Sequence, residues 1–256
     1  MNLYEAVYAR KSVRCFAKEA VSGKTIESIR KFYQEMEGLF GGIETELVIL
    51  ENRKEKRSFM GFASVKAPYY LALYTSNQEK CMMNAGYVMQ QLALYLCSRG
   101  LGSCFVGMNV LRPRLRKRGD KMLACLLAFG KSKGSYTRKP VDARRQDLKE
   151  LCIFKEKPRL WMTQLLEAAR LAPSSMNSQP WRFVVYDNRI HVFSRKYKAK
   201  SGQLGRGTEL NFGILFSNMM VVAEELWLDV DLIRLDEMNQ KKYPNSQYVL
   251  SVILRA

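Results

Sequence analysis

An internal repeat constrains the fold of this chain more than any other feature of its sequence. Residues 84–91 (NAGYVMQQ) have a counterpart in residues 211–218 (NFGILFSN), shifted by 127 positions. Residues 47–53 (LVILENR) likewise resemble residues 183–189 (FVVYDNR), and the elements recur in the same order. Chance likeness between two amphipathic helices would not reproduce that order, so we expect a chain built from two similar halves.

Hydrophobic periodicity and turn residues predict helices and strands in both halves. The expected helices are 3–9, 22–36, 84–99, 161–171 and 211–226, and the expected strands are 46–50, 69–74, 123–129, 182–186, 190–193 and 248–254. Between residues 141 and 158 the composition shifts to charged residues with little periodicity, which is typical of a linker. The sequence therefore predicts an α+β fold of two halves, residues 1–150 and 151–256.

The composition is that of a globular protein with a strong positive charge. Of 256 residues, 42 are Lys or Arg and 24 are Asp or Glu, which gives a net charge of +18, and 47% are hydrophobic. No apolar run approaches the roughly 20 residues of a membrane span. The first residues also lack the basic and apolar stretches of a secretory signal. We therefore expect a cytoplasmic protein that does not associate with membranes.

Neither histidine nor cysteine offers a clear catalytic candidate in this sequence. The only histidine, His191, alternates with Ile190 and Val192 in a strand-like run, which favours a structural role. The six cysteines form no C-x-x-C pair, and their spacing predicts buried thiols rather than disulfides or a metal site. A Ser-His-Asp triad or a zinc-binding helix would have to use His191, so we expect a bound cofactor to supply the chemistry. No catalytic acid or base can be named.

Residues 172–181 (APSSMNSQPW) carry the strongest binding signal. Pro173 and Pro180 fix φ and stiffen the stretch, while Ser175, Asn177 and Gln179 offer donors and acceptors at alternate positions. Such a rigid polar rim suits a planar ligand with several ring heteroatoms. A helix C-terminus followed by a turn would explain the proline and serine but not the whole run, so we favour a binding loop.

A second segment, residues 10–14 (RKSVR), is compact and cationic. In an extended conformation Arg10, Ser12 and Arg14 project to the same side, because alternate residues share a face. Two guanidinium groups and a hydroxyl then match the geometry and charge of a phosphate. Standing alone, such a charge run is more typical of a solvated face.

Taken together, the two segments resemble the nitroreductase-like family of FMN-dependent flavoproteins. The resemblance covers nearly the whole chain and includes residues 100–103 (GLGS), residues 123–130 and residues 138–140 (RKP). It implies that the phosphate and ribityl chain of FMN are held by Arg10, Lys11, Ser12, Arg14 and Arg138. It further implies ring contacts from Val106, Gly107 and Met108 and from the loop residues Pro173, Ser174, Ser175, Asn177 and Gln179.

The sequence departs from the family in the order of these parts. In the family, one chain carries both segments near its N-terminus, and two chains form a homodimer with flavin at the interface. Here residues 37–42 (EGLFGG) lack the polar loop, and no Arg-x-Ser-x-Arg precedes the loop of the second half. The resemblance therefore implies a fused pseudo-dimer whose halves keep complementary parts of one flavin site, so that a monomer suffices.

The implied activity is that of an FMN-dependent oxidoreductase. It would pass hydride from NADH or NADPH through FMN to a small oxidised acceptor such as a nitroaromatic or a quinone. One alternative is a flavin-binding storage or sensor protein without turnover. Another is nucleic-acid binding through residues 112–118 (RPRLRKR), which is less favoured because no aromatic residues are interleaved with the charges.

Overall fold

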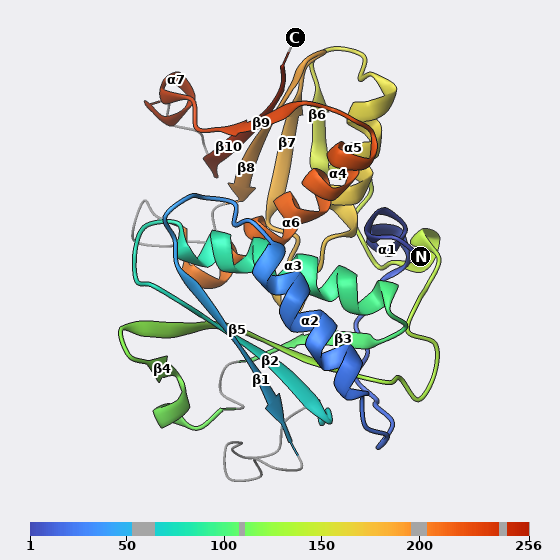
Figure 1. Cartoon of the computed structure of the whole chain (residues 1–256). Coiled ribbons are helices and arrows are strands. Elements are labelled where there is room, and N and C mark those ends of the chain that lie inside the picture. The colour runs from blue at the N-terminus through green and yellow to red at the C-terminus, as the bar shows by residue number, and fades with distance from the viewer. Residues whose placement is uncertain (53–64, 108–110, 196–203, 241–244, 256) are drawn as a thin grey trace. The chain divides into compact units, whose positions relative to one another are not determined.

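Two β-sheets, one in each part of the chain, organise the computed structural model of this protein (Figure 1). The structure describes residues 1–52, 65–107, 111–195, 204–240 and 245–255. These residues form two compact units, Met1–Ala143 and Arg144–Ala256, which we call unit 1 and unit 2. The division between the units falls within the charged stretch 141–158.

Unit 1 contains an antiparallel sheet in the order β1-β2-β5-β3, with the short β4 paired to β5. Its helices and strands are α1 (Leu3–Ala9), α2 (Gly23–Glu35), β1 (Thr45–Glu51), β2 (Tyr69–Thr75), α3 (Cys81–Ser98), β3 (Gly102–Val106), β4 (Lys117–Arg118) and β5 (Lys121–Gly130). Asn2 and Glu5 form a capping box at the start of α1. The Ser22 side chain caps α2, as the sequence predicts.

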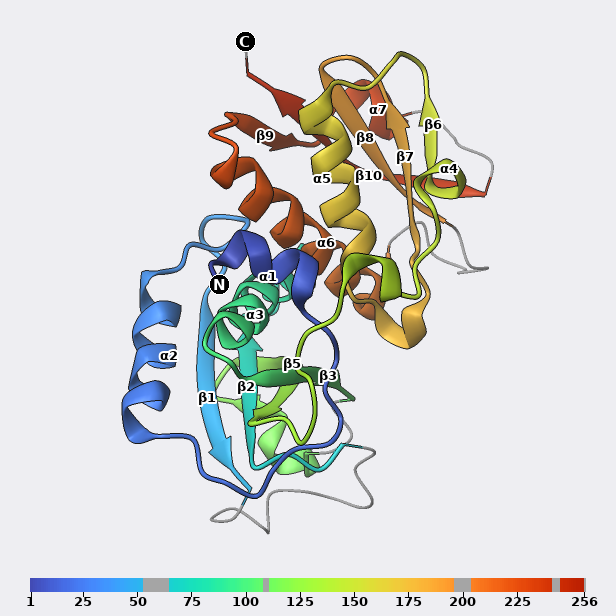
Figure 2. The same ribbon diagram turned by 90° about the vertical axis from the view of Figure 1, so that its right-hand side faces the viewer.

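The core of unit 1 lies around α3 and the central strands. Every residue of β2 is buried, and its register places Leu71 opposite Leu127 of β5. Most of α3 is buried as well, and α1 and α2 both pack against it (Figure 2). Because α3 also contacts β2, β3 and β5, it supports these strands through a packed interface.

Unit 2 contains a sheet in the order β6-β7-β8-β10-β9. Its helices and strands are α4 (Leu148–Leu151), β6 (Cys152–Phe154), α5 (Leu160–Leu171), β7 (Trp181–Val185), β8 (Arg189–Arg195), α6 (Arg206–Glu225), β9 (Val230–Ile233), α7 (Asp236–Gln240) and β10 (Ser246–Leu254). Strand β6 runs parallel to its neighbour, β7, and the other pairings between the described strands of unit 2 are antiparallel. Helices α5 and α6 pack against each other (Figure 2).

The two units repeat one topology, which gives the sequence repeat a structural counterpart. The order β1-β2-β5-β3 in unit 1 corresponds to β7-β8-β10-β9 in unit 2, with antiparallel pairing throughout. In each unit a helix precedes the first of these strands and a longer helix follows the second. The register shifts by one residue in β5 and likewise in β10, at Ala124 and Val249. The predicted α+β fold class is confirmed.

Several details differ from the sequence-based expectation. Strands β3 and β6 were not predicted, because one follows a glycine-rich stop signal and the other lies in the charged stretch between the halves. Five of the six cysteines are buried as expected, but Cys15 is exposed, since it lies in an extended segment beside Lys66 and Lys133 rather than in the core. Among the described helices, none has the length and apolar character to cross a membrane.

Candidate functional site

The segment that follows α1 runs in an extended conformation beside the start of β3. The Val13 backbone N–H donates to the Ser103 carbonyl at 2.9 Å, and Ser12 and Ser103 form a parallel bridge. Val13 is buried against Gly102, where an added Cβ would come within 2.7 Å of Val13 Cγ2. Glycine at position 102 therefore permits the close approach that brings Ser12 beside Ser103.

The same segment pairs with the chain that follows β5. Arg10 forms an antiparallel bridge with Thr137, and the Arg138 backbone N–H donates to the Ala9 carbonyl at 2.8 Å. Arg138 thus lies beside Arg10, although the two are far apart in sequence. The structure brings together the parts of the first half that the family resemblance assigns to a phosphate.

Arg10 is a buried cation whose hydrogen-bonding capacity is only partly used. Its side chain is 5% exposed, and its Nη1 has no hydrogen-bond partner among the described residues. The Ser103 hydroxyl is also buried and likewise has no hydrogen-bond partner among the described residues. A buried charge without a counterion is costly, so this position favours an anionic ligand.

The electrostatics of Arg10 indicate a surplus of positive charge. Burial lowers the pKa of Arg10 to about 10, the thiols of Cys104 and Cys97 oppose this, and the charge of Arg138 adds to it. No carboxylate is among the described groups that shift this pKa. At neutral pH Arg10 remains protonated, and it has a second guanidinium nearby instead of an acidic partner.

Arg14 and Ser12 lie near the same buried thiol as Arg10, that of Cys104. Burial raises the pKa of the Cys104 thiol, whereas the charges of Arg14 and Arg10 and a hydrogen bond with Ser12 lower it. All three groups therefore lie close to one thiol. We call Arg10, Ser12, Arg14, Ser103 and Arg138 the cationic cluster. Lys11, in the same extended segment, is partly exposed.

The residues expected near a flavin ring lie at the other end of β3. Val106 is the last residue of that strand and is partly buried, and Gly107 follows it and is exposed. Met108 lies outside the described residues. Because a strand rises about 3.3 Å per residue, Val106 is about 10 Å from Ser103 along β3.

In unit 2, the loop after α5 has an unusual backbone. The family resemblance places this loop, residues 172–180, at the flavin ring, and for that reason we call it the flavin loop. Met176, Asn177 and Gln179 have φ values of 51°, 56° and 44°, in the left-handed region that non-glycine residues rarely adopt. Each such residue costs on the order of 1–3 kcal/mol. The surrounding structure must therefore impose this conformation.

One side of the flavin loop is held by α6. The Asn211 side chain is buried, and its Oδ1 accepts hydrogen bonds from the Ser175 backbone N–H at 3.0 Å and from the Ser175 hydroxyl at 3.4 Å. Within the loop, the Gln179 N–H donates to the Ser174 hydroxyl oxygen at 3.0 Å. Pro173 is buried, whereas Ser175 and Asn177 are exposed.

The other side is held by residues 144–146, the linker segment. Arg145 Nη1 donates to Asn177 Oδ1 at 2.6 Å, and Asn177 Nδ2 donates to the Arg144 carbonyl at 2.9 Å. The Gln146 N–H donates to Gln179 Oε1 at 2.8 Å. The side-chain amides of Asn177 and Gln179 are predicted from the sequence to contact the ligand. In the structure they use part of their hydrogen-bonding capacity in contacts within unit 2. The sequence does not indicate that Arg145 and Gln146 contact the loop. For Asn211 the repeat provides an indication, because it pairs this residue with Asn84.

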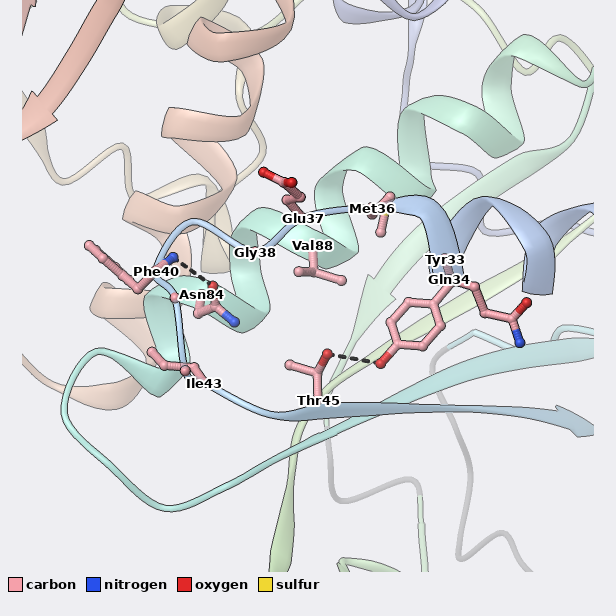
Figure 3. A pocket seen from close by; sticks show the side chains of 12 residues that line it. Tyr33, Gln34, Met36, Glu37, Gly38, Phe40, Ile43, Thr45, Asn84 and Val88 are labelled. Carbon is pink, nitrogen blue, oxygen red and sulfur yellow. Dashed lines mark hydrogen bonds between the residues drawn. The ribbon is translucent and has the colours of Figure 1, made fainter.

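Unit 1 has an equivalent of this arrangement with different chemistry. Asn84, the repeat counterpart of Asn211, accepts a hydrogen bond at Oδ1 from the Phe40 backbone N–H at 3.1 Å (Figure 3). In unit 1 the loop that contains Phe40, residues 37–42, lines a pocket of about 490 Å³. The pocket is lined by Tyr33, Gln34, Met36, Glu37, Gly38, Phe40, Gly41, Gly42, Ile43, Thr45, Asn84 and Val88. None of the residues predicted to bind the cofactor belongs to this lining.

His191 lies in the sheet of unit 2 and is buried. Its Nδ1 is 2.6 Å from the Ser251 hydroxyl, which is 2.7 Å from the Tyr248 hydroxyl. Burial lowers the pKa of His191, and the charge of Arg189 lowers it further. The imidazole therefore belongs to a buried hydrogen-bond network in the sheet.

A family profile and a solved structure similar to this chain are both described as nitroreductases. A family profile described as "Putative TM nitroreductase" matches residues 2–223. The crystal structure described as a putative nitroreductase from Thermotoga maritima is 18% identical, has a TM-score of 0.66, and aligns over 99% of this chain and 94% of its own. No curated protein matches the chain.

Two further similar structures align with part of this chain only. An FMN-dependent nitroreductase from Clostridium difficile is 17% identical with a TM-score of 0.45, over 58% of this chain and 96% of its own. A nitroreductase with bound FMN from Desulfitobacterium hafniense is 13% identical with a TM-score of 0.46, over 57% of this chain and 100% of its own. The similarity to the Thermotoga protein extends over both units.

Proposed function

This chain belongs to the nitroreductase family whose profile it matches over residues 2–223, and from that premise we propose that it is an FMN-dependent oxidoreductase. The proposed reaction passes hydride from NADH or NADPH to a small oxidised acceptor such as a nitroaromatic or a quinone. The six free cysteines suit the reducing cytoplasm, which we propose as its location.

The buried Arg10 carries this proposal. Its Nη1 and the Ser103 hydroxyl have no hydrogen-bond partner among the described residues, and with the neighbouring Arg138 they supply donors and positive charge. A phosphate monoester offers several acceptor oxygens and close to two negative charges, which would satisfy these donors together. The residues present therefore fit the phosphate of FMN.

The course of β3 supports the orientation of the cofactor. With the phosphate held by the cationic cluster at the start of β3, Val106 and Gly107 at the other end of the strand would be the residues that contact the ring. Gly107 is exposed, and no atom of the described residues lies within 4 Å of the position that a Cβ would take there, which leaves room beside the backbone for a planar ring. The flavin loop of unit 2 would contribute Ser174, Ser175 and Asn177 to the ring.

In this mechanism the protein binds and orients, and bound FMN supplies the hydride chemistry. Arg10, Arg14 and Arg138 would hold the phosphate by charge, and Ser12 and Ser103 would add hydroxyl donors. The backbone conformation of the flavin loop would keep the residues that face the ring in one arrangement. No side chain is assigned the role of an acid or base.

We further propose that the two halves supply complementary parts of a single site. The repeated topology supports an origin by duplication, since β1-β2-β5-β3 and β7-β8-β10-β9 follow one plan. Only unit 1 has the Arg-x-Ser-x-Arg segment, and only unit 2 has the polar loop. One chain would then complete one site as a monomer.

Visible absorbance and anaerobic reduction test the proposal. The purified chain is mixed with FMN, freed of excess cofactor, and scanned for flavin absorbance. Stopped-flow mixing with NADH or NADPH then follows flavin bleaching, and reoxidation by a panel of nitroaromatics and quinones identifies acceptors. A chain that takes up no FMN contradicts the proposal. Binding without bleaching by either nicotinamide would indicate a flavin-binding protein without turnover.

A further inference from the structure

We propose that Arg145 is a positioning residue of the flavin site, holding the flavin loop in the conformation that meets the ring. The inference rests on the proposed function and adds to it a residue outside both signature segments. It assigns a structural task to the stretch of chain that joins the two units, which sequence reasoning treated as a linker.

The contacts of Arg145 converge on the loop from one side. Nε donates to the Ala172 carbonyl at 3.2 Å and Nη2 to the Leu171 carbonyl at 3.4 Å. Nη1 donates to Asn177 Oδ1 at 2.6 Å and to the Arg144 carbonyl at 3.1 Å. One planar guanidinium thus joins the end of α5 to the left-handed part of the loop, a geometry that a single ammonium cannot reproduce.

The position of Arg145 also suits the end of a helix. The last carbonyls of α5 (Leu160–Leu171) lack partners within the helix and carry partial negative charge. Arg170, the basic residue of the last turn, is paired with Glu167 at 2.8 Å. Arg145 therefore brings a cation from outside the helix to the carbonyls of Leu171 and Ala172.

The loop depends on such contacts because its apex has little packing of its own. Met176 is 99% exposed, so it buries no apolar surface to offset the strain of its left-handed backbone. The contact with Asn211 holds Ser175 on one side. On the other side Arg145 holds Asn177, and loss of that contact leaves the strained Met176 with a weaker anchor on that side.

The variants Arg145→Ala and Arg145→Lys test this role, with Arg144→Ala as the matched control. Arg144 is exposed, and its substitution removes the same charge from the next position while leaving the carbonyl that Asn177 uses. Dissociation constants for FMN and for riboflavin are measured by flavin fluorescence, together with the visible circular dichroism of the bound flavin. Hydrogen exchange of residues 174–179 is followed without flavin.

We expect Arg145→Ala to weaken FMN and riboflavin equally, by about 10- to 100-fold, the range for losing a hydrogen bond to a charged group. The visible dichroism should change and exchange in residues 174–179 should accelerate. Arg145→Lys should recover only part of the affinity, and Arg144→Ala should match the wild type. Asn177→Ala combined with Arg145→Ala should weaken flavin binding by less than the product of the two single effects, since both variants remove the contact between Arg145 Nη1 and Asn177 Oδ1.

Two results overturn the assignment while leaving the proposed function intact. One is wild-type affinity for both flavins in Arg145→Ala; the other is a loss for FMN alone, which would place Arg145 at the phosphate. If Arg145→Ala does not fold, wild-type flavin affinity in Arg145→Lys contradicts the role. A wild-type chain that binds no flavin overturns the proposed function, and the positioning role with it.

Discussion

Replacing Arg10 with methionine is expected to stabilise the flavin-free protein and to weaken FMN binding at the same time. Methionine keeps much of the length and flexibility of the arginine stem and removes the charge. Because Arg10 is buried with no carboxylate partner among the described groups that shift its pKa, the substitution removes an unfavourable charge from the fold. The same charge is the one that the phosphate would need.

The size of the effect follows from the pKa. Burial lowers the pKa of Arg10 from 12.5 to about 10, and at about 1.4 kcal/mol per pKa unit the buried charge costs on the order of 3 kcal/mol. We expect Arg10→Met to raise the free energy of unfolding by about 1–3 kcal/mol, since some packing is lost with the side chain. The FMN dissociation constant should rise about 10- to 150-fold, and riboflavin binding should stay unchanged.

Urea unfolding of the flavin-free protein and fluorescence titration with both flavins measure the two effects. Arg30→Met is the matched control, because Arg30 is exposed on α2 and lies outside the cationic cluster. It should change neither the free energy of unfolding nor the flavin affinities. A large loss of stability in Arg10→Met, or equal weakening of FMN and riboflavin, would refute the assignment of Arg10 to the phosphate.

Three further outcomes are expected. Gly102→Ala should destabilise the fold by about 1–3 kcal/mol and weaken FMN, because the new Cβ meets Val13 Cγ2 at 2.7 Å and Val13 Cβ at 2.8 Å; adding Val13→Ala removes only the Cγ contacts and should recover part of both losses, whereas adding Val13→Gly removes every side-chain contact and should recover more FMN affinity in the same assays. The free energy of unfolding should fall as pH drops below about 6.5, because burial lowers the pKa of His191 and the unfolded chain binds the proton first; His191→Gln should flatten this dependence in urea titrations at several pH values. Mixing chains that carry Arg10→Met with chains that carry Asn177→Leu should restore no tight FMN binding, whereas recovery would show that the site forms between chains.

The sequence predicts the elements with strong local signals. The start of α2 follows from Ser22, whose side chain caps it, and the core faces of the long helices follow from their periodicity. Helices α3 and α6 begin three and five residues before their predicted starts, at Cys81 and Arg206, because neither start has a side-chain cap to mark it. Strand β3 escapes prediction because its pairing with β5 is long-range, and its five residues follow a glycine-rich turn. The repeat of topology follows from the sequence offset between residues 84 and 211.

The candidate site is predicted only in part. The residue types at positions 10–14 and 172–181 indicate phosphate and ring chemistry, but the sequence cannot show that Arg10 is buried with an unpartnered Nη1. The contact between Arg145 and Asn177 cannot be predicted from the sequence either, since a charged residue in a stretch without periodicity has no pattern that relates it to a distant loop. Such contacts depend on how distant segments meet, which a local pattern does not encode.

The number of FMN molecules bound per chain at saturation tests the central claim most directly. Equilibrium titration of the flavin-free chain, with protein concentration fixed by amino-acid analysis, gives this number. If the halves hold complementary parts of one flavin site, each chain binds one FMN. A chain that binds no FMN contradicts the flavin assignment, and a chain that binds two contradicts the division of one site between the halves.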